Sequence, residues 1–64
     1  MWTVVYVTQN KKAALAIKAA LEKLGMLVKI KPTDRSSADQ NCFEVLVPYA
    51  EVSEALNVII DMDA

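Results

Sequence analysis

Few side chains in this sequence could carry out catalysis or hold a metal ion. Cys42 is the single cysteine and the chain contains no histidine, so the sequence offers no second thiol or imidazole that could share a metal or resolve an oxidised thiol. A lone thiol commonly serves as a small apolar side chain. We therefore expect no catalytic residue, no metal site and no bound cofactor, with Cys42 as a bystander.

Two pairs of acidic residues are the remaining candidates for chemistry. Glu51 with Glu54, and Asp61 with Asp63, could supply carboxylates for metal binding or for proton transfer. Acidic residues on an exposed helix and its tail are more often solvated, and a deep pocket is hard to build from 64 residues. The sequence therefore predicts a protein that is not an enzyme.

The charged residues are divided unevenly along the chain. Residues 1–35 contain all seven Lys and Arg with two acids, a net charge of +5, whereas residues 36–64 contain six acids and no base, a net charge of −6. This asymmetry could orient a partner, although surface charge more often serves solubility. Because the whole chain carries a net charge of −1, we expect no nucleic-acid partner.

The length and composition predict one small domain, spanning residues 1–64. A core of this size supplies modest stability, and self-association is a common remedy. The single cysteine cannot close an internal disulfide, which favours a reducing compartment. We see no signal peptide and no run of membrane-spanning length, so we predict a cytoplasmic location and no membrane partner.

The hydrophobic patterns predict five elements that must position any functional residues. Strands are expected at about 2–8, 26–31 and 42–47, helices at about 11–24 and 49–60, and a long loop at 32–41. Asn10 and Gly25 are suited to cap the two ends of the first helix. Pro32 and Pro48 are expected to end their strands. The buried stripe of the second helix is predicted to contain Val52, Ala55, Leu56 and Ile59.

This order predicts an α+β fold, a βαββα sandwich with both helices on one face of a three-stranded sheet. A right-handed crossover followed by a hairpin gives the sheet order 2-3-1, which is a ferredoxin-like fold lacking its last strand. Recognition by small domains is commonly placed on loops. The candidate interaction residues are therefore those of the long loop, namely Thr33, Asp34, Arg35 and Asp39.

The sheet face away from the helices is the second candidate. If Val5 and Val7 point toward the helices, this face displays Trp2, Val4 and Tyr6 beside Leu27 and Leu46. Exposed apolar areas of several hundred Å² usually mark an interface, so we expect a homodimer or homotrimer formed through this face. The opposite register, which would bury Trp2 and Tyr6 beneath the helices, stays open.

The aromatic side chains expected on this sheet also raise an RNA-binding alternative. Trp2 and Tyr6 on an open sheet are typical of the stacking platforms of RNA-recognition modules. Glu44 on the same face and the acidic second half of the chain argue against RNA.

Several segments together resemble a known family. They are the opening Met1-Trp2-Thr3-Val4-Val5-Tyr6-Val7, the helix end Leu21-Glu22-Lys23-Leu24-Gly25, the strand Leu27-Val28-Lys29-Ile30 and the turn Val45-Leu46-Val47-Pro48. The chain is similar to a family of short bacterial proteins described as prokaryotic signal-transducing proteins, a domain of unknown function. The resemblance implies a βαββα fold akin to the nitrogen-regulatory PII proteins, whose long loop after the second strand contacts a partner protein.

These observations favour a small regulatory or protein-interaction domain, active in signal transduction, with a protein partner. The alternative is a sensor of an amino acid or another metabolite, with its ligand held at a subunit interface. Regulatory domains of that kind favour a glycine between the first strand and the first helix, where this chain has Thr8, Gln9 and Asn10.

Overall fold

The computed structural model describes residues 1–33 and 42–63 of the chain. Within these ranges the elements follow one another as strand, helix, strand, strand and helix, with a short 3-10 turn before the last helix. Their bounds are β1 Trp2–Thr8, α1 Lys11–Lys23, β2 Lys29–Thr33, β3 Cys42–Pro48, η1 Tyr49–Glu51 and α2 Val52–Asp63.

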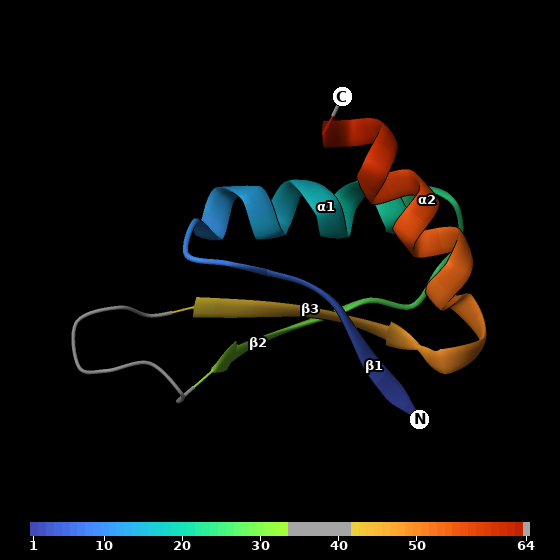
Figure 1. The fold of residues 1–64 in the computed structure, drawn as a ribbon, viewed down its shortest axis with the longest axis horizontal. Coiled ribbons are helices and arrows are strands. Elements are labelled where there is room, and N and C mark those ends of the chain that lie inside the picture. Colours follow the sequence, from blue (N-terminus) through green and yellow to red (C-terminus); the bar gives the residue numbers. More distant parts are fainter. Residues whose placement is uncertain (34–41, 64) are drawn as a thin grey trace.

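The three strands form one antiparallel sheet in the order β1-β3-β2, with β3 in the centre. Both helices lie on the same side of this sheet, and no helix of residues 1–33 and 42–63 lies on the other side (Figure 1). The predicted α+β class is therefore confirmed, and so is the predicted strand order, which is the same order counted from the opposite edge. The sheet has one covered face and one face without a helix, and this difference determines where a functional surface can lie.

The first helix begins at a side-chain cap, as the sequence predicts. The Asn10 side chain accepts hydrogen bonds from the backbone N–H groups of Lys12, at 2.9 Å, and Ala13, at 3.3 Å. Thr8 supports the cap, because its hydroxyl oxygen accepts a hydrogen bond of 3.0 Å from the Asn10 backbone. These bonds satisfy backbone donors that the first turn of a helix leaves without an intrahelical partner.

The same helix ends where Gly25 takes a left-handed conformation, with φ of +89°. The Gly25 N–H donates to the Glu22 carbonyl at 2.9 Å, and the Met26 N–H donates to the Leu21 carbonyl at 3.3 Å. This pair of bonds is the Schellman arrangement, which satisfies the last carbonyl groups of a helix. The predicted C-cap role of Gly25 is confirmed.

The core lies between the helices and the covered face of the sheet. Leu21, Val45 and Val47 are its largest fully buried side chains. The alternation of β3 is as expected, with Val45 and Val47 toward the helices. The buried cluster comprises Ala14, Ile17, Leu21, Met26, Val45, Val47, Ala55 and Ile59.

The bounds of two elements, β2 and α2, differ from the expectation at both ends. The strand β2 starts at Lys29 and continues to Thr33, so Pro32 lies inside it opposite Phe43 and does not end it. An edge strand tolerates proline because one side of its backbone has no neighbouring strand to receive an N–H donor. The helix α2 starts only at Val52, since the 3-10 turn follows Pro48.

The second helix also differs in the face that it buries. Ala55 and Ile59 are buried as predicted, but Leu56 is 40% exposed. The prediction that Leu56 belongs to the buried stripe is wrong, because the face that packs against the core contains Val52 and Val58 beside Ala55 and Ile59. No helix in the described ranges is both long enough and apolar enough to cross a membrane.

The most consequential irregularity is a register shift in β1 between Val4 and Tyr6. Val4 lies opposite Leu46 and Tyr6 lies opposite the adjacent Val45, so Val5 is an extra residue on the β1 side. A bulge of this kind interrupts the alternation of side chains along a strand. Residues on the two sides of Val5 therefore follow different alternations.

Candidate functional site

The helix-free side of the sheet, which we call the open face, carries the candidate site. The strand pairing places its side chains in three rows across the sheet. The apolar end row has Trp2 opposite Pro48, the middle row has Val4, Leu46 and Lys29, and the charged end row has Val7, Glu44 and Lys31. The open face thus changes from apolar to charged along the strands.

Four large apolar side chains are exposed on or beside this face. The exposed fractions are 39% for Trp2, 41% for Val4, 53% for Val7 and 67% for Leu27. Leu27 precedes β2 and alternates with Met26 and Val28, which belong to or pack against the core, so it points away from the core. Apolar groups on a sheet face that no helix covers are available to a partner.

The Trp2 ring is held in place by a basic neighbour. The Lys29 ammonium lies 4.4 Å from the centroid of the Trp2 ring. Trp2 belongs to β1 and Lys29 to β2, so this cation–π contact spans the central strand. Leu46 lies on that strand in the row of Lys29 but is only 7% exposed, so the prediction that this face displays Leu46 is wrong. The contact therefore arranges an aromatic surface on the open face.

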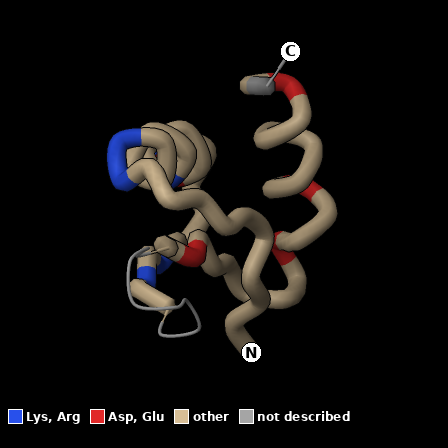
Figure 2. The backbone as a smooth tube through the Cα atoms, turned by 60° about the vertical axis from the view of Figure 1, so that its left-hand side comes forward, with Lys and Arg blue, Asp and Glu red and all other residues tan. Residues whose placement is uncertain are grey.

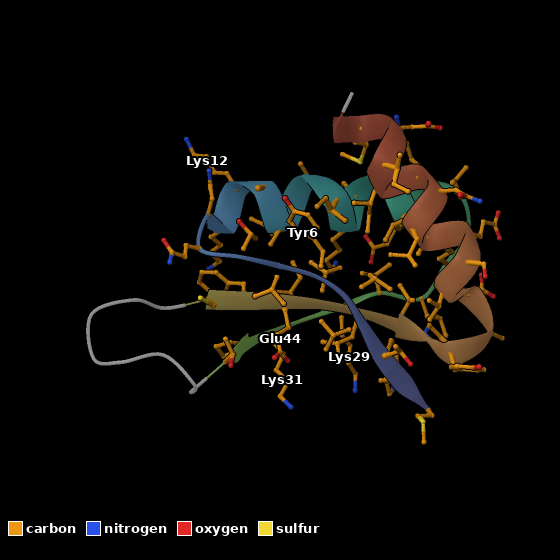
Figure 3. The ribbon with its side chains drawn as sticks, viewed as in Figure 1. Tyr6, Lys12, Lys29, Lys31 and Glu44 are labelled. Atoms are coloured by element: carbon orange, nitrogen blue, oxygen red, sulfur yellow. The ribbon has the colours of Figure 1, made fainter. Side chains whose placement is uncertain are left out.

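The charged end row consists of groups from all three strands. Lys31 lies opposite Glu44 across the β2–β3 pair, and Val7 lies opposite Glu44 on the other side. Figure 3 shows Lys29, Lys31 and Glu44 all pointing away from the helices. The two lysines and one glutamate give this end a small excess of positive charge.

Tyr6 does not belong to the open face, and the prediction that it shares a face with Trp2 is wrong. It lies opposite the buried Val45 and packs against the core, on the helix side of the sheet (Figure 3). The bulge at Val5 is the physical reason, because it reverses the alternation after Val4. Val7 therefore takes the place on the open face that was expected of Tyr6.

This arrangement corrects both registers considered for β1. Trp2 is on the open face, as in the first register, whereas Tyr6 faces the helices, as in the second. The aromatic pair expected for RNA stacking is therefore split between the two faces of the sheet, and the RNA alternative loses its structural basis.

The predicted interaction loop is described only at its first residues. Asp34, Arg35 and Asp39 lie outside the described residues. Pro32 and Thr33, the first two residues of the predicted loop, belong instead to β2, and Thr33 lies opposite Cys42. Among the candidate loop residues, only Thr33 is thus placed, at the charged end of the open face.

The basic and acidic residues that the structure describes lie mostly on different helices and strands. Figure 2 shows basic residues on α1 and near β2, and acidic residues along α2. The helix α2 carries Glu54 and Asp61 with no basic residue, whereas the sequence of α1 contains four lysines and Glu22, which accepts a salt bridge of 3.0 Å from Lys18. The charged residues of the open face come from β2 and β3 and not from the acidic helix α2. They are two lysines and one glutamate, so the open face is more basic than acidic.

The described side chains show no catalytic arrangement. No group of three or more His, Cys, Asp or Glu residues in the described ranges could hold a metal ion, and no polar or charged residue there is buried. Cys42 is a free, half-buried thiol on the strand β3. The geometry offers surfaces for contact and no assembled set of reacting groups.

Two contributors to the open face were missed from the sequence. Val7 could not be identified, because the bulge that turns it outward has no local signature such as a glycine. Lys29 could have been found from the sequence. The alternation of residues 26–31 directs its side chain to the face of the sheet away from Val28 and Ile30, which is the face of Trp2.

Comparisons with known proteins do not add to this description. No family model, no curated protein and no solved structure gives a significant match to the chain.

Proposed function

We propose that this protein is a small, non-enzymatic interaction domain that associates with a second copy of itself through the open face. The observation that carries the proposal is the exposure of Trp2, Val4, Val7 and Leu27 on or beside a sheet face without a helix. A sheet normally buries an apolar face against another layer, and the described part of the chain places its helices on one face only. A second copy would supply the missing layer.

The edges of the sheet favour the β1 side of this surface. The strand β2 is an edge that contains Lys29, Lys31 and Pro32, all of which discourage pairing with another strand. The strand β1, the opposite edge, contains no charged residue and no proline. We therefore place the contact over Trp2 of the apolar end row and Val4 of the middle row, which together we call the apolar end of the open face. The charged end row then lies at the rim of the contact.

We assign the protein a regulatory role in the bacterial cytoplasm and kinship with the short signal-transducing family that its sequence resembles. The fold would be ferredoxin-like, akin to the PII proteins but without the last strand. The βαββα order and the central position of β3 support this kinship. Fold kinship by itself ranks hypotheses and does not assign a partner.

The test is sedimentation of the wild-type protein and of two lysine variants over a wide range of concentrations. Val4→Lys places a charge in the middle of the apolar end and should abolish self-association. Leu15→Lys is the matched control, because Leu15 is 48% exposed on α1, away from the sheet, and should leave association unchanged. A wild-type protein that stays monomeric at the highest concentration would overturn the proposal.

A further inference from the structure

A pocket of about 160 Å³ lies on the other side of the sheet, between β1 and the two helices. Among the lining residues that the structure describes, Tyr6 alone has a polar side chain. The lining residues are Tyr6, Ala13, Ala16, Ile17, Ile59 and Met62. Figure 3 shows Tyr6 pointing from β1 toward the helices.

The pocket exists because of two features of the chain. The bulge at Val5 turns Tyr6 toward the helices, whereas regular alternation would leave Tyr6 on the face of Trp2. The helix α1 has alanine at positions 13 and 16, so no long side chain fills the space between the helices. Met62 is 46% exposed and stands at the surface, which gives the pocket an entrance.

The lining determines what kind of molecule fits. None of the six lining residues carries a charge, so these residues offer a charged ligand no ion-pair partner. The volume is close to that of an engineered apolar cavity of about 150 Å³ that binds benzene. A ring of about the size of benzene therefore fits this volume.

The Tyr6 hydroxyl favours a bound molecule that can form a hydrogen bond. None of the side-chain hydrogen bonds found among residues 1–33 and 42–63 involves this group. A phenolic hydroxyl can both donate and accept a hydrogen bond. A bound molecule with one hydroxyl or carbonyl group could use it, whereas a pure hydrocarbon could not.

We propose that this pocket binds a small, uncharged aromatic molecule that carries one hydrogen-bonding group, with the Tyr6 hydroxyl as its partner. The site lies within one copy of the chain and on the opposite side of the sheet from the open face. It therefore does not depend on self-association, and it differs from a sensor whose ligand sits between subunits.

The experiment titrates the full chain, labelled with ¹⁵N and with ¹³C methyl groups, with phenol and separately with toluene. The two probes have almost the same shape, but only phenol carries a hydroxyl. Both should give saturable shifts at the methyl groups of Ile17, Ile59 and Met62, with intermolecular NOEs from the probe ring. Phenol should bind more tightly than toluene.

Three variants separate the contributions. Tyr6→Phe should lower the affinity for phenol about fivefold, because it removes the hydroxyl that bonds to phenol. The affinity for toluene should stay unchanged, because the aromatic ring of residue 6 is kept. Ala16→Leu should fill the pocket and abolish binding of both probes. Ala19→Leu is the matched control on the exposed side of α1 and should leave both affinities unchanged.

Several results would overturn the proposal. They are the absence of saturable shifts for both probes, shifts that persist in Ala16→Leu, and equal weakening of phenol and toluene by Tyr6→Phe. Should Ala16→Leu fail to fold, the NOEs from phenol to the wild-type methyl groups decide the question, since binding elsewhere would give none to Ile17 or Ile59.

Discussion

The Lys29 ammonium lies 4.4 Å from the centre of the Trp2 ring, across the central strand of the sheet. The two residues are 27 positions apart in the sequence, and they meet because β1 and β2 both pair with β3. Trp2 is the only tryptophan of the chain, so its fluorescence reports directly on this contact. The contact also defines the apolar end of the open face.

Replacing Lys29 by methionine should destabilise the protein by about 0.5–1 kcal/mol, because the apolar stem is kept while the cation–π attraction is lost. Denaturation followed by Trp2 fluorescence measures this effect, and the native emission should change as well. Lys31→Met is the matched control on the same strand and face, opposite Glu44. A Lys29→Met variant with the stability and the native emission of the wild type would show that the contact with Trp2 contributes nothing.

Because of the bulge, we expect a lysine substitution to be destabilising at position 6 and tolerated at position 7. Tyr6→Lys should cost about 2 kcal/mol or more, because it places a charge against the core, whereas Val7→Lys should change the free energy of unfolding by less than about 0.5 kcal/mol. Urea denaturation of the two variants measures both values. A strand with regular alternation that places Tyr6 on the open face would reverse the order, and that result would contradict the register shift at Val5.

Leu21 is fully buried between α1 and the sheet, and its truncation should be severe. Leu21→Ala should cost about 2–5 kcal/mol through lost burial and the remaining cavity. That is a large part of the roughly 5–15 kcal/mol typical of a whole domain, so partial unfolding at room temperature is expected. Leu15→Ala on the exposed side of the same helix is the control in a thermal melt followed by circular dichroism. A similar loss in both variants would contradict the assignment of the buried face.

Gly25 should be replaceable only at a cost in backbone energy. A Cβ atom at this position would meet no atom within 4 Å, so the φ of +89° is the single obstacle. Gly25→Ala should destabilise the protein by about 1–2 kcal/mol, and Gly25→Asn by less, because asparagine tolerates the left-handed region. Chemical denaturation of the two variants gives the comparison. An alanine variant as stable as the wild type would show that the helix can end in another conformation.

The local features of this protein could be predicted from its residues alone. The first helix could be placed almost exactly, since Asn10, the alanine-rich stretch and Gly25 act within a few residues of one another. The alternation of β3 was equally clear, because a central strand in contact with a core must repeat every two residues. The α+β class and the strand order followed from the order of these elements.

The orientation of the β1 side chains and the extent of β2 depend instead on how the strands pair in the folded sheet. The bulge at Val5 exists relative to the partner strand, so no local pattern within residues 2–8 reveals it. Pro32 could remain in β2 because that strand lies at an edge, which is a property of the whole sheet. The open face and the pocket at Tyr6 both depend on these pairings between strands, which is why the sequence placed Trp2 correctly and Tyr6 on the wrong side.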